Sequence, residues 1–141
     1  MYDFSNVNGL QWAGLFGGLL LLVMLVLSVN VVIGRNKHRV LLGDGGNLEM
    51  AVASRGFGNA AEYIPAAIAM LTLLALTDAP HWLIQIVGAL MLAGRIIHPF
   101  GLKATGGVTV PRLVGMVLTW LSLSIGSVAL VWTFIFAQAG N

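Results

Sequence analysis

Long uninterrupted runs of apolar residues dominate this chain, rather than an alternation of apolar and polar positions. The first run covers residues 10–33 and contains no charged side chain. As a helix, a run of that length rises roughly 36 Å, and the hydrocarbon core of a bilayer is about 30 Å thick. The run therefore predicts a membrane-spanning helix, and its continuity excludes a transmembrane barrel, whose strands alternate.

Three further runs predict spanning helices, over residues 48–76, 80–98 and 111–136. Pro80 and Pro111 suit the first turn of the last two helices, where a missing backbone N–H has no partner to lose. Asp78 and Thr109 precede these prolines by two residues, so we expect them to cap the same helices. Pro99 is expected to close the third helix, because the residue before a proline disfavours helical geometry.

Composition supports a membrane protein. Apolar residues make up 58% of the chain and charged residues only 9%, whereas soluble domains are about 25% charged. Seven Lys and Arg against five Asp and Glu are too few for a nucleic-acid partner. The absence of cysteine excludes a cysteine nucleophile, and the three histidines are not spaced as metal ligands. The sequence thus predicts one all-α domain over residues 1–141, an integral membrane four-helix bundle without a metal.

The basic residues gather on one side of the predicted bundle. With four spans, the first and third connections share one face of the membrane, and both termini share the other. Cytoplasmic loops of membrane proteins are enriched in Lys and Arg. This rule places the two long connections in the cytoplasm and both termini in the periplasm of a bacterial inner membrane. All seven basic residues lie in or near those connections: Arg35, Lys37, Arg39, Arg55, Arg95, Lys103 and Arg112.

A polar stripe occupies the first half of the second span. Arg55, Asn59 and Glu62 are spaced i, i+4 and i+7, so they share one helical face, and Tyr63 follows. A charge at the centre of a membrane helix costs on the order of 2.5–3.5 kcal/mol. The stripe must therefore face the bundle interior, a subunit interface or a wet cavity. It is either an Arg–Glu pair that joins helices or a site for a charged ligand, and the basic groups nearby favour the ligand.

Arg95 and His98 form a second polar group, because their i, i+3 spacing places them on one face of the third span. Each residue also has an ordinary interpretation. His98 alone is typical of an interfacial histidine with one hydrogen bond. Arg35 and Arg112 are typical of positive-inside anchors at the ends of spans.

The segment Arg55-Gly56-Phe57-Gly58-Asn59-Ala60-Ala61-Glu62-Tyr63-Ile64-Pro65 resembles the R-x-x-x-N-x-x-E-[YF]-x-P signature of the MAPEG family, the membrane-associated proteins of eicosanoid and glutathione metabolism. Residues 94–98 and 115–120 agree with the same family. The loop over residues 38–46 is similar to that of small bacterial inner-membrane members. The resemblance covers nearly the whole chain.

The resemblance implies a homotrimer of four-helix subunits that binds glutathione between neighbouring protomers, near the cytoplasmic end. By position, Arg112 matches the arginine that stabilises the glutathione thiolate and is the expected catalytic residue. Leu102 departs from the family, because the mammalian enzymes carry a tyrosine there, and the 102–112 loop is about one residue longer than theirs. The residues expected to bind glutathione are Arg35, Arg55, Asn59, Glu62, Tyr63, Arg95 and His98.

The expected function is that of a glutathione transferase or peroxidase, with glutathione as co-substrate. Its thiolate would attack a lipophilic electrophile that arrives from the membrane lipids along the apolar walls of the first and fourth spans. One alternative is a small multidrug-type proton antiporter, whose membrane carboxylate must be free to exchange a proton. Arg55 on the face of Glu62 disfavours that role. The other alternative is a non-catalytic membrane protein that binds glutathione.

Overall fold

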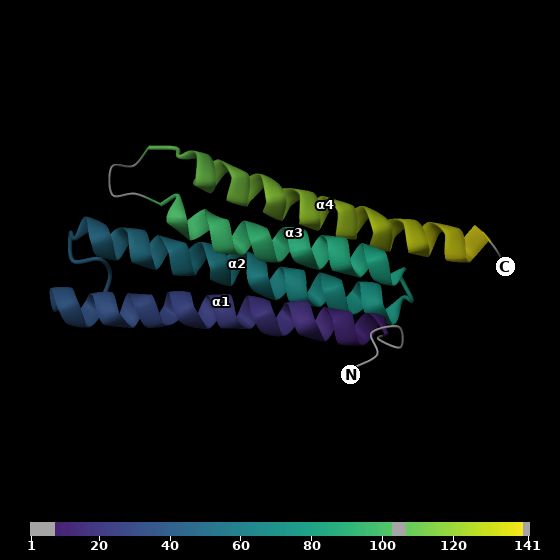
Figure 1. Cartoon of the computed structure of the whole chain (residues 1–141), viewed down its shortest axis with the longest axis horizontal. Helices are drawn as coiled ribbons and strands as arrows, with labels where there is room; N and C mark the ends of the chain where they lie inside the picture. Colours follow the sequence, from purple (N-terminus) through teal and green to yellow (C-terminus); the bar gives the residue numbers. More distant parts are fainter. Residues whose placement is uncertain (1–7, 103–106, 140–141) are drawn as a thin grey trace, which may run out of the picture.

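Four antiparallel helices form the protein in a computed structural model that describes residues 8–102 and 107–139 (Figure 1). All four are long and apolar enough to cross a membrane, and no strand occurs in the described ranges. This confirms the predicted all-α transmembrane bundle. Lys103, one of the seven predicted cytoplasmic cations, lies outside the described residues. The helices are α1 (Gly9–His38), α2 (Leu48–Leu76), α3 (His81–Phe100) and α4 (Val110–Ala139).

Helix α1 continues beyond the apolar run that predicted it. It begins with a capping box, in which the Asn8 side chain accepts from the backbone of Gln11 and the Gln11 side chain accepts from the backbone of Asn8. It ends at His38, and Arg39 follows in the left-handed conformation with φ of 54°. Backbone hydrogen bonds of a helix are local, so polar residues can extend it beyond the membrane. Hydrophobicity therefore predicted the span and not the full helix.

The expected side-chain cap of α3 is wrong. Pro80 itself is the N-cap of α3 and no side chain caps it, while Asp78 adopts a left-handed φ of 54° in the preceding turn. Thr109 directly precedes α4, and its carbonyl accepts from the Leu113 N–H at 3.0 Å. Its hydroxyl donates to the Gly101 carbonyl at 2.6 Å, which ties the end of α3 to the start of α4. Its expected role as a side-chain cap stays a prediction.

Pro99 does not close α3, which continues to Phe100, two residues beyond the predicted end. A proline removes one backbone donor, and in the last turn of a helix this affects few hydrogen bonds. The helix ends at Gly101, whose N–H donates to the His98 carbonyl at 3.1 Å.

The helices pack mainly in two pairs, α1 with α2 and α3 with α4, and α2 and α3 lie between the outer two (Figure 1). Within the described ranges, α1 and α4 do not contact each other. A buried apolar cluster fills the centre, and it includes Leu20, Ile64, Leu71, Ile84 and Met91. The outer faces of α1 and α4 expose many large apolar side chains, so they are suited to lipid or to a neighbouring subunit.

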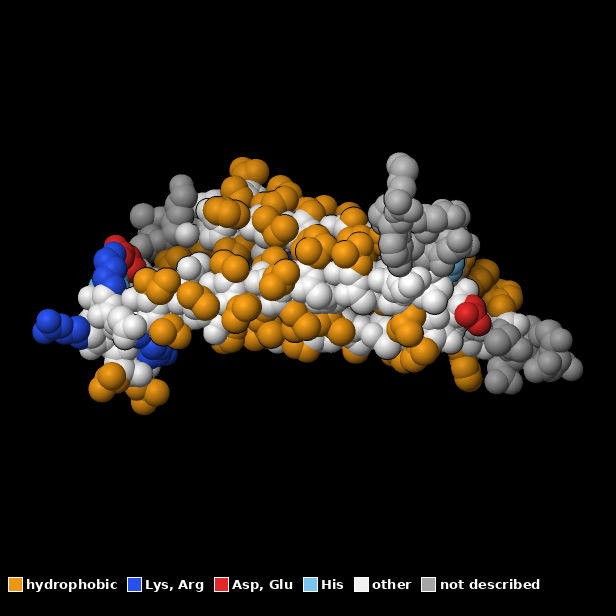
Figure 2. All heavy atoms as spheres, turned by 60° about the horizontal axis from the view of Figure 1, so that its bottom comes forward, with side chains coloured by type: hydrophobic (Ala, Val, Ile, Leu, Met, Phe, Trp, Pro, Cys, Tyr) orange, Lys and Arg blue, Asp and Glu red, His pale blue; other side chains and the backbone are white. Residues whose placement is uncertain are grey.

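Charged side chains gather at the ends of the molecule, and hydrophobic ones cover its length (Figure 2). The basic groups lie at the end that carries the connection between α1 and α2. The same end holds the close of α3 and the start of α4, while α1 begins and α4 ends at the other end (Figure 1). The structure therefore places the basic connection at one end of the bundle and the start of α1 and the end of α4 at the opposite end.

Candidate functional site

The predicted polar stripe of α2 is present on one face of the helix. The Arg55 guanidinium lies 3.7 Å from a Glu62 carboxylate oxygen, and both side chains are more than half exposed. Asn59 lies between them in sequence but is buried, with 6% of its surface exposed. The stripe thus has an open, charged edge and a buried amide, because its two ends reach outward while its centre faces α3.

Arg95 of α3 lies behind this stripe and joins three helices. It is 1% exposed, although it carries a full charge. Its Nη1 donates to Oδ1 of Asn59 at 2.5 Å, and its Nη2 donates to the Thr119 hydroxyl of α4 at 2.6 Å. The guanidinium carbon lies 5.1 Å from the centroid of the Tyr63 ring, within the range of a cation–π interaction. Arg95 therefore links α2, α3 and α4 at one level of the bundle.

The charge of Arg95 is not matched by an acid in the described part of the chain. Its acceptors are neutral, and the Thr119 hydroxyl in turn donates a hydrogen bond to the Gly115 carbonyl at 2.8 Å. The ion pairs of the described residues involve Glu49 and Glu62, and neither carboxylate contacts Arg95. A buried charge of one sign is costly unless it meets an opposite charge. The interior beside Asn59 is therefore electropositive and suited to a nearby anion.

His98 and Arg112 lie at the crossing of α3 and α4, towards the basic end. His98 is buried, with 4% of its surface exposed, and its backbone lies against Gly115. Arg112 is half-buried, and its backbone lies against Gly101. Neither glycine leaves room for a side chain, which shows how closely the two helices approach. The structure thus brings both predicted residues to the helix ends that flank the stripe.

Arg35 is not brought to the stripe within one protomer. Its Nη1 donates to the Leu41 carbonyl at 2.9 Å and so holds the connection between α1 and α2. Lys37 and His38 nearby contact the Glu49 carboxylate at 2.8 and 3.0 Å. No hydrogen bond or ion pair among the described residues joins Arg35 to the other predicted ligands. Its predicted role in glutathione binding therefore requires a neighbouring protomer and stays a prediction.

Thr119 and Gly115 are site residues whose role the sequence analysis missed. Both lie in a stretch that matched the family, but nothing in their spacing identified Arg95 as their partner. A buried threonine in an apolar span was the available signal, because a hydroxyl in a membrane requires a hydrogen-bond partner. Leu102, at the position where the family carries tyrosine, lies beside Gly56 of α2.

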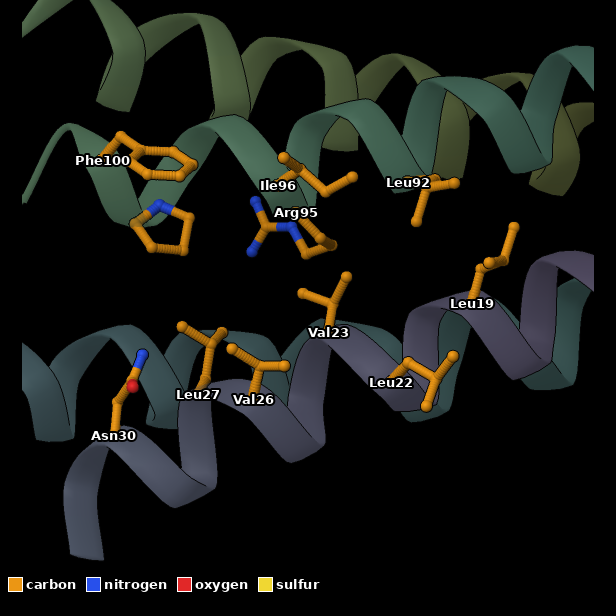
Figure 3. Close-up of a pocket in the computed structure, with 11 residues that line it drawn as sticks. Leu19, Leu22, Val23, Val26, Leu27, Asn30, Leu92, Arg95, Ile96 and Phe100 are labelled. Atoms are coloured by element: carbon orange, nitrogen blue, oxygen red, sulfur yellow. The ribbon is translucent and has the colours of Figure 1, made fainter. Parts of the chain in front are cut away.

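An apolar groove of about 540 Å³ lies between α1 and α3, on the other side of Arg95 (Figure 3). Its walls are aliphatic, with Asn30 and Phe100 at the end nearer the basic loops. Arg95 lines this groove and also contacts Asn59, so it separates the groove from the stripe. The other lining residues include Leu19, Val23, Leu27, Leu92 and Ile96.

Comparison with known proteins supports the family resemblance. The MAPEG family model matches residues 13–132, a stretch that begins in α1 and ends in α4. The "inner membrane protein YecN" of Escherichia coli strain K12 is 36% identical to this chain over 120 residues, which are 85% of this chain and 90% of that protein. The protein of the same name from Escherichia coli O6:H1 matches with the same identity and coverage.

Proposed function

Because this chain belongs to the MAPEG family of membrane proteins in eicosanoid and glutathione metabolism, we propose that it is a glutathione transferase or peroxidase of the bacterial inner membrane. The observation that carries the proposal is the arrangement of the α2 stripe. An exposed Arg55–Glu62 pair lies beside a buried Asn59, with the uncompensated Arg95 cation behind it. This combination offers both signs of charge to a ligand at one place.

Glutathione complements these charges, because it carries two carboxylates and one ammonium group. Arg55 can clasp a carboxylate with two parallel hydrogen bonds, and Glu62 can accept from the ammonium. At 3.7 Å and with more than half of each side chain exposed, their mutual pair is weak. A ligand that brings both opposite charges can therefore replace the pair without a large loss.

A homotrimer completes the site in this proposal. One protomer contacts the ligand from a single side, since Arg55 and Glu62 are open outward. A neighbouring protomer would cover them and bring Arg35 to the ligand. The exposed apolar faces of α1 and α4 supply the surface for such contacts and for membrane lipid.

In this proposal the lipophilic substrate binds against the exposed apolar faces of α1 and α4. These helices do not contact each other in the described protomer, so a cleft between them forms only where α1 of one subunit meets α4 of the next. The groove between α1 and α3 is a poorer choice, because Arg95 separates it from Asn59. These apolar side chains do not specify the chemical identity of the electrophile.

Arg112 is the proposed catalytic residue, with its guanidinium beside the sulfur of glutathione. A nearby positive charge favours the thiolate over the thiol, and the thiolate is the nucleophile. Its sulfur would form a bond to the electrophilic carbon while the leaving group departs with the bonding electron pair. Holding the two reactants together in the right orientation would lower the activation free energy by several kcal/mol more. The chain supplies no thiol of its own, because it has no cysteine.

Two other functions are less well supported. A proton antiporter needs a carboxylate that can exchange its proton for a cation, and the Arg55 guanidinium, 3.7 Å from Glu62, repels a cation at that place. A non-catalytic glutathione-binding protein would keep the stripe and lack turnover. The name of the Escherichia coli relatives mentions no activity, so assays must separate this alternative from the transferase.

The deciding experiment is calorimetry of the detergent-solubilised protein with glutathione, followed by conjugation of a chlorodinitrobenzene acceptor. We expect saturable binding and measurable turnover. Arg112→Ala should keep binding within a few fold, while turnover and the ultraviolet absorbance of the bound thiolate fall at least tenfold. Absence of binding at millimolar glutathione would refute the proposal. Binding without turnover would identify the non-catalytic alternative.

A further inference from the structure

We propose that Arg95 is a positioning residue that fixes the Asn59 amide with its oxygen inward and its NH₂ group outward, so that Asn59 binds a hydrogen-bond acceptor of the ligand. The inference deepens the proposed function and rests on it for the identity of the ligand. The acceptor is a carboxylate or carbonyl oxygen of the glutathione peptide. Asn59 therefore selects against a donor, such as an ammonium group, at this place.

The orientation of the amide follows from the chemistry of its partner. A guanidinium has five N–H donors and no acceptor. The Asn59 atom that lies 2.5 Å from Nη1 of Arg95 must therefore be the oxygen, because an amide nitrogen there would set two donors against each other. This argument removes the usual ambiguity between the oxygen and nitrogen of an asparagine side chain.

The outward NH₂ group of Asn59 is available to a ligand. No described residue accepts a hydrogen bond from it, since the one bond of the Asn59 side chain is the bond that its oxygen accepts. The neighbours of Asn59 on the same helical face, Arg55 and Glu62, are more than half exposed. A ligand held by these two residues would therefore lie next to the Asn59 amide.

If the Asn59 amide turned, the Arg95 guanidinium could not move with it, because contacts with other helices hold the guanidinium in place. Thr119 accepts from Nη2 at 2.6 Å, and the Tyr63 ring lies against the guanidinium carbon at 5.1 Å. With 1% of its surface exposed, Arg95 has no water to replace a lost acceptor. Rotation of the amide would leave a buried cationic donor unpaired, which is among the costliest defects of a protein interior.

The charge of Arg95 adds to this selection. It lies behind Asn59 without a carboxylate partner in the described chain, and charge interactions are stronger in such an apolar setting. An anionic acceptor on the outer side of the amide gains from that charge, whereas a cation is repelled. Amide orientation and charge thus favour the same chemical group.

Asn59→Asp tests the proposal, because it keeps an acceptor towards Arg95 and removes the outward donor. We expect the thermal unfolding midpoint without ligand to stay within a few degrees of the wild type or to rise. Glutathione affinity should fall at least tenfold. Asn59→Ala removes both functions, so it should lower the unfolding midpoint and the affinity together. Arg95→Met should lower the midpoint and weaken glutathione binding, with intact Asn59 present.

Two results would overturn the proposal. Wild-type affinity for glutathione in Asn59→Asp would show that the NH₂ group does not contact the ligand. An unfolding midpoint of Asn59→Asp as low as that of Asn59→Ala would show that no oxygen of residue 59 accepts from Arg95. The second readout needs no ligand, so it tests the orientation of the amide even if wild-type protein fails to bind glutathione and the proposed function is wrong.

Discussion

In the proposed site, Arg55 and Arg95 have different roles because their exposure differs. Arg55 forms an exposed pair with Glu62, and such pairs contribute only about 0–1 kcal/mol. Arg95 is buried among neutral acceptors, so breaking its contacts leaves the N–H donors of a buried cation without hydrogen-bond partners. The exposed pair can open for a ligand while the buried cation stays in place. At the scale of the residue, burial rather than charge separates a ligand-binding group from a positioning group.

At this scale, Glu62→Gln tests how the exposed pair is used. If Glu62 accepts from the glutathione ammonium, the variant should lose about tenfold in affinity for glutathione. It should lose little for an analogue without the amino group, because that contact does not exist there. Isothermal calorimetry with both ligands measures the difference. Equal losses for the two ligands would mean that Glu62 acts only by holding Arg55.

Helices α3 and α4 approach each other closely enough to bring Thr119 within reach of Arg95. A Cβ at Gly94 would lie 2.7 Å from the Thr119 hydroxyl, and one at Gly115 would lie 2.7 Å from the Cα of His98. Small residues at such crossings let helix backbones approach closely in membranes. The close packing of α3 against α4 therefore brings the Thr119 hydroxyl to the position where it accepts a hydrogen bond from Arg95.

Gly115→Ala tests this contact at the scale of the element. The added methyl group must push α3 and α4 apart, and overpacking of this kind costs about 1–3 kcal/mol. We expect a lower unfolding midpoint in detergent and weaker glutathione binding through the displaced Arg95. Gly14→Ala is the size-matched control, because no heavy atom of the protomer lies within 4 Å of the Cβ that it adds. Equal stability of the two variants would argue against the close crossing.

The described molecule has one basic end and an opposite end where α1 begins and α4 ends, with an apolar surface between them (Figures 1 and 2). The candidate site lies towards the basic end, where α3 closes and α4 begins. Under the positive-inside rule this end faces the cytoplasm. A ligand from the cytoplasm would then meet a second substrate from the bilayer at the same level of the bundle.

Fused reporters test this topology for the whole chain. Alkaline phosphatase placed after Asn141 should be active, because both termini are expected in the periplasm. The same enzyme inserted after Gly43, in the connection between α1 and α2, should be inactive, and a fluorescent protein there should be bright. The reverse pattern would overturn the sidedness of the proposed site and the source of its glutathione.

The four spans, their antiparallel order and the basic end can be predicted from the amino-acid sequence alone. These features depend on runs of apolar residues and on the positions of charged residues, both of which are visible in the sequence. It also determined that Arg55 and Glu62 share a face, because helical periodicity is a local property. The ends of the helices were less predictable. No side chain caps α3, although Asp78 was expected to do so, and α3 continues through Pro99.

Which polar groups contact each other depends on how the helices pack. Arg95 contacts Asn59, 36 residues away, and Thr119, 24 residues away, and no periodicity of one helix specifies such pairs. The pairs depend on how α3 lies against α2 and how closely α4 approaches at Gly94 and Gly115. Spacing along a single helix fixes the face of a side chain, whereas its partner and its exposure depend on the register between helices. The sequence therefore predicted Arg95 as a polar residue of the site, and the fold turned its guanidinium inward.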